Sequence, residues 1–250
     1  MQPKAAINDF VIKFANVNGT GSASANGMFA KAIFRMGIPV SPRNIFPSNI
    51  QGLPTWYEVR ISQDGYLGRR GGIDMMVSVN PQSFAKDVGE VDPGGYMLYD
   101  STKPLDLRHV RRDIHYLGIP LTEMCLREYT DSRQRQLFKN VIYVGALSAL
   151  LNIDFAVLKD LVSEQFKGKE KLITPNIHAL EMGHQYASTH FECPLGIQLK
   201  AGEETPKHIQ EFDQILMDGN TATALGAVYA GATVAAWYPI TPSTSVVDAF

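Results

Sequence analysis

The chain has 250 residues, of which 45% are hydrophobic and 19% charged, with a formal net charge of −2. This length allows one large or two small globular domains with a substantial core. The charge offers no overall attraction to nucleic acid, and the Arg69-Arg70 pair lacks the aromatic neighbours of an RNA-binding motif. No segment approaches the roughly 18 apolar residues of a membrane span, so we expect a cytoplasmic protein without nucleic-acid or membrane partners.

The sequence begins with a predicted strand, a loop of small residues and a helix. The apolar run from Phe10 to Phe14 has strand length, and apolar side chains in residues 28–36 repeat at helical spacing. The loop between them contains four residues that are candidates for binding a ligand: Gly19, Thr20, Gly21 and Ser22. Because the first N–H groups of a helix lack intrahelical acceptors, a phosphate-carrying ligand is predicted here. The alternative is that the small residues only let the helix pack closely on the sheet.

The loop matches neither of the two common phosphate-binding motifs. Ser24 stands where the dinucleotide fingerprint G-x-G-x-x-G has its third glycine, and the Walker lysine is absent. No acidic residue clearly ends a second strand about 20 residues further on, as that fingerprint also requires. A stand-alone dinucleotide-dependent oxidoreductase therefore stays only as an alternative hypothesis.

The next part of the chain is predicted to form an α/β domain with a largely parallel sheet, to about residue 125. The first helix should end at Gly37, and residues 40–55, which contain three prolines, are expected to be irregular. Further elements follow in order: strands at 56–62 and 73–79, a helix from Pro81 to Gly89, and strands at 96–99 and 114–119. The glycine-containing loop would then lie at the carboxyl end of a strand, where such sheets bind ligands.

A helical extension is predicted after this domain. Apolar patterns indicate helices at 141–151, 155–168 and from Pro175 to His190. Three histidines in the last helix are six residues apart and so do not share a face, so no metal site is expected there. The two cysteines, Cys125 and Cys193, cannot supply four thiolates for an iron–sulfur cluster and are expected to be inert thiols.

Two further segments complete the predicted organisation into a domain at 1–190, a linker at 191–208 and a second domain from 209. Asp218 should cap a small-residue helix at 218–232, followed by a strand at 234–237 and a final helix at 246–250. These elements cannot bury enough surface to fold alone, so we expect the chain to be a fragment of a longer polypeptide.

Several motifs resemble one enzyme family. The runs DGNTATALGA at 218–227 and WYPITPS at 237–243 are similar to the start of the pyrimidine-binding domain in alpha subunits of 2-oxoacid:ferredoxin oxidoreductases. The early glycine loop, QGLP at 51–54, EVRIS at 58–62 and GIDMMVSVNP at 72–81 resemble the gamma domain of the same enzymes, although their glycine loop is usually denser. The implied fold is a gamma-type α/β domain with a helical extension, then the truncated start of a thiamine-diphosphate-enzyme α/β domain.

The resemblance implies reversible, coenzyme A-dependent oxidative decarboxylation of a 2-oxoacid, with electrons passed to ferredoxin, and the expected reaction is 2-oxoglutarate to succinyl-CoA. Thiamine diphosphate, Mg²⁺ and a [4Fe–4S] cluster would be held mainly by a partner beta subunit, in a dimer of alpha–beta heterodimers. The acidic residue expected against the aminopyrimidine ring would lie beyond Phe250. A non-catalytic scaffold subunit is the remaining alternative.

The resemblance also implies two sets of binding residues, with no catalytic residue and no metal ligand in this chain alone. Coenzyme A is expected at the loop from Gly19 to Ser22, with Arg69 and Arg70 as possible cations for its phosphates. The carboxylate of the oxoacid is expected at three residues of the proline-rich loop: Thr241, Pro239 and Ser243.

Overall fold

The computed structural model describes residues 2–17, 19–45, 54–202, 214–240 and 243–250. They divide into two compact units, Met1–Ile209 and Gln210–Phe250. Within these described ranges, no helix combines the length and the apolar character that crossing a bilayer requires.

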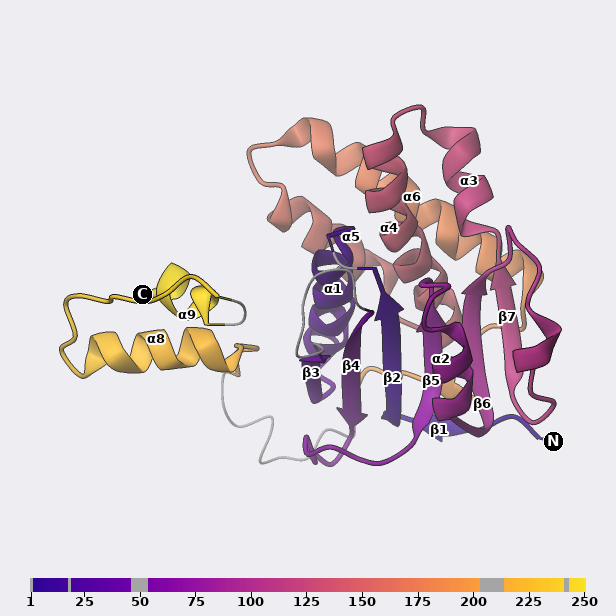
Figure 1. Cartoon of the computed structure of the whole chain (residues 1–250), viewed down its shortest axis with the longest axis horizontal. Coiled ribbons are helices and arrows are strands. Elements are labelled where there is room, and N and C mark those ends of the chain that lie inside the picture. The colour runs from indigo at the N-terminus through magenta and orange to yellow at the C-terminus, as the bar shows by residue number, and fades with distance from the viewer. Residues whose placement is uncertain (1, 18, 46–53, 203–213, 241–242) are drawn as a thin grey trace. The chain divides into compact units, whose positions relative to one another are not determined.

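A six-stranded sheet forms the centre of the first unit, in the order β3-β4-β2-β5-β6-β7 (Figure 1). Four neighbouring strands run parallel: β2 (Asp9–Asn16), β5 (Ile73–Ser78), β6 (Val91–Asp100) and β7 (His115–Ile119). Antiparallel pairing adds β4 (Thr55–Ser62) beside β2, and β3 (Val40–Ile45) beside β4. The predicted mainly parallel α/β sheet is confirmed.

Strand β3 was not expected, because its segment contains prolines. Pro42 lies opposite Val59 on this outermost strand. A strand at the edge of a sheet has hydrogen-bonding neighbours on one side only, so a residue without an N–H group is tolerated there. The prediction of an irregular segment is therefore wrong for residues 40–45, and residues 46–53 lie outside the described part.

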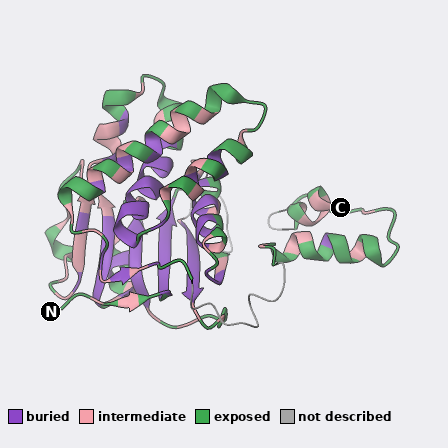
Figure 2. Ribbon diagram, turned by 180° about the vertical axis from the view of Figure 1, so that it is seen from behind, coloured by how far each residue is buried: buried purple, intermediate pink, exposed green. Residues whose placement is uncertain are grey.

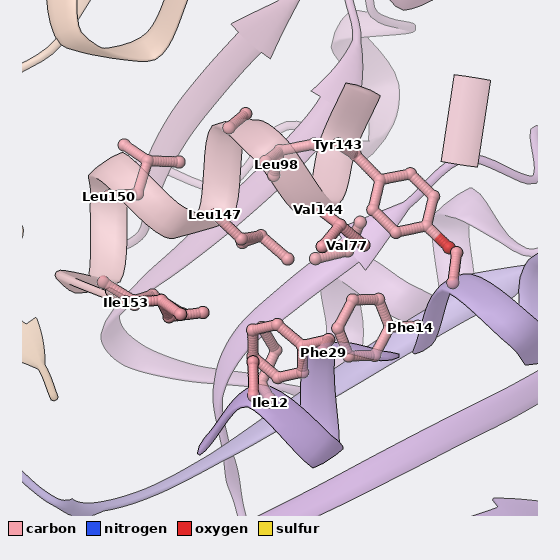
Figure 3. Close-up of a cluster of buried hydrophobic side chains, with 14 of the residues drawn as sticks. Ile12, Phe14, Phe29, Val77, Leu98, Tyr143, Val144, Leu147, Leu150 and Ile153 are labelled. Atoms are coloured by element: carbon pink, nitrogen blue, oxygen red, sulfur yellow. The ribbon is translucent and has the colours of Figure 1, made fainter. Parts of the chain in front are cut away.

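One face of the sheet carries the main core and most of the helices. These helices are α1 (Ser22–Arg35), α3 (Leu121–Glu128), α4 (Ser132–Leu151), α5 (Phe155–Gln165) and α6 (Glu170–His190). Side chains from the strands meet those of α1 and α4 in Figure 3, where Phe14, Phe29 and Tyr143 lie close together. The central strands of the sheet and the inner part of α4 are buried, while the outer helix faces are exposed (Figure 2).

Two of these helices begin earlier than predicted. Helix α4 starts at Ser132, where the Asp131 side chain accepts a hydrogen bond from the Gln134 N–H. Its first two turns are mostly exposed and polar, so they lack the apolar pattern that reveals the rest. Helix α6 starts at Glu170 and contains Pro175, whose missing N–H removes one bond near the exposed beginning of the helix.

The opposite face of the sheet carries a smaller core and helix α2 (Phe84–Glu90), which begins three residues after the predicted Pro81. Val88 of α2 packs with Val11 and Met76 of the strands, whereas Phe29 of α1 packs with Ile12 on the other face. The helices that follow β2 and β5 therefore lie on opposite faces.

Residues 195–199 belong to the first unit and not to a linker. Strand β8 (Ile197–Gln198) pairs in parallel with β1 (Ala6–Ile7). The Leu195 and Leu199 N–H groups donate to the last carbonyls of α4, and Ile197 and Leu199 are fully buried. These alternating apolar residues attach the segment to the first unit. Its proline and glycine residues had made it look like a linker in the sequence.

The second unit contains α8 (Gly219–Tyr229) and α9 (Thr244–Ala249). Asp218 caps α8 as predicted, accepting from the N–H groups of Asn220 and Thr221. The predicted strand at 234–237 is wrong, because this segment is irregular. A strand needs a partner for its backbone hydrogen bonds, and the described residues of this unit contain no other strand.

Candidate functional site

After the carboxyl ends of β2 and β5, the chain continues toward opposite edges of the sheet. From β2 the chain continues through α1 to β3 and β4, and from β5 it continues through α2 to β6 on the other side. Ligands of open α/β sheets bind in the crevice at such a switch point. Here the Asn80 amide donates to the Asn16 carbonyl (3.1 Å) and joins the two strand ends. This edge of the sheet is therefore the candidate site.

The glycine loop after β2 occupies one half of this edge. Gly19 and Gly21 have φ angles of 79° and 78°, in the left-handed region that favours glycine. A Cβ atom on Gly21 would overlap the Leu137 side chain of α4, whereas one on Gly19 would meet nothing within 4 Å. Close packing against α4 thus contributes to the need for Gly21, but packing does not explain Gly19.

The same loop presents the N-terminus of α1. Gly21 is the N-cap residue, no described side chain caps the first N–H groups, and the first turn contains no acidic residue. The Thr20 hydroxyl donates to the Val17 carbonyl (2.7 Å), so it is engaged within the loop. Ser22 is buried, while Ala23 and Ser24 are exposed. The arrangement leaves backbone N–H groups and an exposed Ser24 hydroxyl available to an anion.

A cavity of about 570 Å³ occupies the other half of the edge. Its lining comes from four parts of the chain: the end of β5 with residues of the following loop and of α2, the end of β6 with residues of the loop that follows it, Thr122 of α3 and Lys139 of α4. Val79, Pro81 and Leu105 supply apolar walls, and Asn80 connects the cavity to the end of β2. This size is ordinary for a small-molecule site.

A polar cluster lies at the end of β6 inside this cavity. The Asp100 carboxylate accepts from the hydroxyls of Thr102 (2.7 Å) and Thr122, and Lys139 Nζ lies 3.3 Å from it. Burial alone would raise the pKa of Asp100, but these hydrogen bonds and the Lys139 charge outweigh it and hold the pKa below its ordinary value. Lys139 also donates to the Thr122 hydroxyl (2.9 Å). The cluster fixes a cation at the cavity wall.

A second carboxylate, that of fully buried Asp87, lies behind the cavity wall and holds it by hydrogen bonds. It accepts from Ser78 Oγ (2.9 Å), Ser83 Oγ (2.7 Å) and the Trp56 indole (2.8 Å). Ser78 and Ser83 stand at the two ends of the loop 79–82, which lines the cavity. Burial raises the pKa of Asp87 against the lowering effect of these three hydrogen bonds. One side chain thus holds both ends of the loop.

Arg69 and Arg70 do not lie near the glycine loop, so the prediction that they join it in one site is wrong. They precede β5, whereas the loop follows β2, and in a parallel pair these are opposite ends of the sheet (Figure 1). Strand β5 alone separates them by about 20 Å at ~3.3 Å per residue. Arg70 is paired with Asp74, and Arg69 Nε lies 3.6 Å from Glu58 Oε1.

The second unit contains the predicted oxoacid-binding residues. Pro239 is exposed in an irregular segment. The Ser243 hydroxyl, at the start of α9, donates to the Ile240 carbonyl (2.8 Å). Thr241 lies outside the described residues, so its role stays a prediction.

The cysteines and histidines are dispersed. Cys125 is buried in α3, where burial raises its pKa to about 11, and Cys193 is a second free thiol. His178 contacts Glu128, His184 contacts Ser148, and His190 stacks on Tyr186. The described ranges contain no group of three or more His, Cys, Asp or Glu side chains placed to hold a metal ion. These donors do not fit an iron–sulfur cluster, which needs four thiolates.

The sequence alone did not reveal the cavity residues Asp100, Thr122 and Lys139. They come from three elements and share no local motif. One signal was present, because Asn80 and Asp100 are polar residues directly after or at the end of apolar strands. In a parallel sheet such residues meet at one edge.

Comparison with known proteins gives consistent matches. The family described as pyruvate ferredoxin/flavodoxin oxidoreductase matches residues 11–186. The alpha subunit of 2-oxoacid:ferredoxin oxidoreductase 2 from Aeropyrum pernix is 25% identical over 273 residues, which cover 94% of this chain and 42% of that subunit.

Two solved structures are similar to the chain. The 2-oxoglutarate:ferredoxin oxidoreductase from Magnetococcus marinus, with 2-oxoglutarate, coenzyme A and succinyl-CoA bound, has a TM-score of 0.81 and 26% identity, and the match covers 97% of this chain and 41% of that one. The gamma subunit of a keto/oxoacid ferredoxin oxidoreductase from Geobacter sulfurreducens shares the fold, with a TM-score of 0.59 and 20% identity over 72% of this chain and 99% of that one. The chain spans about two fifths of the Aeropyrum and Magnetococcus chains.

Proposed function

The chain belongs to the pyruvate ferredoxin/flavodoxin oxidoreductase family, and from this premise we propose that it is part of the alpha subunit of a 2-oxoacid:ferredoxin oxidoreductase. In the proposed reaction a 2-oxoacid and coenzyme A give an acyl-CoA, carbon dioxide, one proton and two electrons, and the electrons pass to ferredoxin. The observation that carries this proposal is the family match over residues 11–186, because that range includes both the glycine loop and the cavity.

The two units are proposed to have different tasks. The first unit is assigned as the gamma domain, which a likeness to a separate gamma subunit over nearly all of that subunit's length supports. The second unit, from about residue 209, is assigned as the beginning of the pyrimidine-binding domain, because the Magnetococcus enzyme matches 97% of this chain. The complete alpha subunit would act in a cytoplasmic complex with a beta subunit, as a dimer of heterodimers.

Coenzyme A is proposed to bind to the first unit, with phosphates at the loop from Gly19 to Ser22. The uncapped N-terminus of α1 and the absence of acidic residues in its first turn favour an anion at this place. Arg69 and Arg70 are not part of this proposed site, because they lie at the other end of the sheet.

Thiamine diphosphate and a [4Fe–4S] cluster would supply the chemistry of decarboxylation and electron transfer. The two separate cysteines of this chain do not fit the cluster, so we assign the cluster, the thiamine diphosphate and its Mg²⁺ mainly to the beta subunit. The contribution of this chain is then to bind coenzyme A and to orient the oxoacid. Thr241, between Pro239 and Ser243, is proposed to donate a hydrogen bond to the oxoacid carboxylate.

The substrate is proposed to be 2-oxoglutarate, because the Magnetococcus structure contains it. The test uses the complete alpha subunit co-expressed with its beta subunit. Acyl-CoA formation and ferredoxin reduction are measured with 2-oxoglutarate, pyruvate and 2-oxoisovalerate, each with and without coenzyme A. We expect succinyl-CoA from 2-oxoglutarate and little product from the others. Preference for another oxoacid would correct the substrate, and a lack of coenzyme A-dependent oxidation with all three would refute the function.

A further inference from the structure

We propose that residues 4–8, the segment before β2, form a strap that fixes the point at which the chain leaves the first unit. The strap acts on residues 195–200, which we call the exit segment, because the chain continues from there to the second unit. The proposal has a second part, which rests on the proposed function: turnover needs both units and depends on this fixed exit.

The Lys4 residue holds the first end of the strap to the sheet. Its ammonium group donates to the carboxylates of Asp74 and Asp92, the latter at 2.7 Å. Asp74 is buried near the beginning of β5, and Asp92 lies near the beginning of β6. The Lys4 N–H group also donates to the Gly94 carbonyl (2.8 Å). Lys4 thus joins the strap to the beginnings of two neighbouring strands, at the end of the sheet opposite the glycine loop.

The middle of the strap contacts the exit segment directly, through the parallel pairing of β1 with β8. The Ala6 N–H group donates to the Gly196 carbonyl (3.0 Å). The Tyr96 hydroxyl donates to the Lys4 carbonyl (3.1 Å) and accepts from the Gly196 N–H group (3.2 Å), so it joins the two segments. A Cβ atom on Gly196 would overlap the Lys4 carbonyl oxygen. This close approach of two backbones therefore requires glycine.

Asn8 closes the other end of the strap by two hydrogen bonds to one residue. Its side-chain amide donates to the Lys200 carbonyl (2.9 Å), and its side-chain oxygen accepts from the Lys200 N–H group (2.9 Å). The Asn8 N–H group donates to the Gln198 carbonyl (3.1 Å). Asn8 has a φ angle of 53°, in the left-handed region that asparagine adopts more readily than most residues. Its side chain extends the β1–β8 pairing by one residue.

The exit segment is also held by α4, through separate hydrogen bonds. The N–H groups of Leu195 and Leu199 donate to the last carbonyls of α4, each at 2.8 Å, and the Asn152 amide donates to the Leu199 carbonyl (3.0 Å). None of these bonds involves the strap. Release of the strap should then free the Lys200 N–H group while Leu195 and Leu199 stay bonded, so the strap can open as a separate local unit.

The test uses two asparagines with the same backbone conformation. Asn8 and Asn152 both have positive φ, so glycine can replace either without backbone strain. In the complete alpha–beta complex, Asn8→Gly should raise the hydrogen-exchange rate of the Lys200 amide about 10-fold, because two hydrogen bonds are lost. Asn152→Gly, the matched control, should leave that rate unchanged. Residue-resolved mass spectrometry measures both. An unchanged rate in Asn8→Gly, or an equal rise in both variants, would overturn the assignment.

Lys4→Met keeps the strap testable if Asn8→Gly does not fold. This variant removes the ammonium group at the other end of the strap and leaves the contacts of Asn8 in place. It should raise the exchange rate of the Lys200 amide about 3-fold, because residues 4–8 open as one unit. A wild-type rate in Lys4→Met would show that the two ends act separately and would refute the strap.

The role in turnover has its own readout. In Asn8→Gly the kcat for acyl-CoA formation should fall about 3-fold, because fewer complexes are correctly positioned at any moment. The KM values for the oxoacid and coenzyme A should stay constant, since each is proposed to bind to one unit. A normal kcat with a raised exchange rate would refute this role. Failure of the proposed function would look different, because the wild-type complex would form no acyl-CoA while the exchange results stayed the same.

Discussion

The side-chain amide of Asn140 donates a 2.7 Å hydrogen bond to the backbone carbonyl of Thr20, joining α4 to the glycine loop. The preceding residue, Lys139, lines the cavity. Helix α4 therefore contacts both halves of the candidate site through adjacent residues. Both residues precede residue 141, where the sequence pattern predicted the helix to begin.

We predict that Asn140→Ala loosens the glycine loop. Asn140 is buried, and its loss leaves the Thr20 carbonyl without its side-chain donor, which costs about 1–2 kcal/mol of unfolding free energy. The KM for coenzyme A should rise 3- to 10-fold, while the KM for the oxoacid stays constant. Gln136→Ala, one turn earlier on the exposed face, is the control and should change neither value. A normal KM for coenzyme A in Asn140→Ala would contradict the role of this contact.

The two loop glycines should differ in their tolerance of a methyl group. Gly19→Ala places an L-residue at positive φ and is expected to cost about 1–2 kcal/mol of stability. Gly21→Ala should cost more, since its Cβ also overlaps Leu137, whose side chain must turn aside. Adding Leu137→Ala should recover the difference between the two variants when measured by denaturant unfolding. Equal costs for both glycines would show that the Leu137 contact is unimportant.

Asp87 should give the protein a specific pH dependence. Its pKa in the folded protein is raised by burial, so the folded protein holds this proton more tightly than the unfolded chain does. The stabilisation from this group is complete below the ordinary aspartate pKa and falls as the pH rises through the raised pKa. Wild type should therefore lose stability relative to Asp87→Asn as the pH rises above about 4, the ordinary aspartate pKa. A stability difference that does not vary with pH would contradict this.

The same residue offers a prediction on the cavity wall. Asp87→Ala leaves the hydrogen-bond donors of Ser78, Ser83 and Trp56 without their acceptor and should cost about 3 kcal/mol of unfolding free energy. Asp87→Asn keeps one acceptor oxygen and should cost less. At a temperature where both variants are folded, the KM for coenzyme A should rise more in Asp87→Ala, with kcat little changed.

Thr241 gives a prediction about the oxoacid. Thr241→Val in the complete enzyme should lower kcat/KM for the oxoacid. The corresponding activation free energy should rise by about 1.5–3 kcal/mol, the usual size of a hydrogen bond to a charged group. The KM for coenzyme A should hardly change. Thr244→Val is a suitable control, because the Thr244 hydroxyl donates to the Ile240 carbonyl at the start of α9. If Thr241→Val has the wild-type kcat/KM for the oxoacid, Thr241 does not bind the oxoacid carboxylate.

Much of the sheet was predictable because its buried strands are short apolar runs or alternate apolar and polar residues. In β4 the apolar residues Val59 and Ile61 alternate with Arg60, and these two apolar side chains lie in the main core. The prolines of β3 concealed a strand, because the pattern does not tell whether a segment lies at an edge. The polar beginning of α4 concealed a helix, since its packing partners lie far away in sequence.

The candidate site was predictable only in part. The glycine loop follows from small residues between a strand and a helix, and that signal is local. The association of this loop with Arg69 and Arg70 failed because the sequence did not show that these arginines precede β5 while the loop follows β2, its parallel neighbour. The cavity assembles residues as far apart as Ser78 and Lys139, so only the folded chain brings them together.

The crossing of α4 and α6 restricts the residues that can replace glycine at two positions of the sequence. Gly145 and Gly183 each lie against the backbone of the other helix, where a Cβ atom would overlap the Leu180 or Ile142 carbonyl oxygen. Neither position accepts even alanine without moving a helix axis, and α4 carries Asn140 and Lys139 one turn or more away. In a mutational screen scored by coenzyme A use, changes at Gly145 should therefore group with changes in the glycine loop, although Gly145 lies in the core.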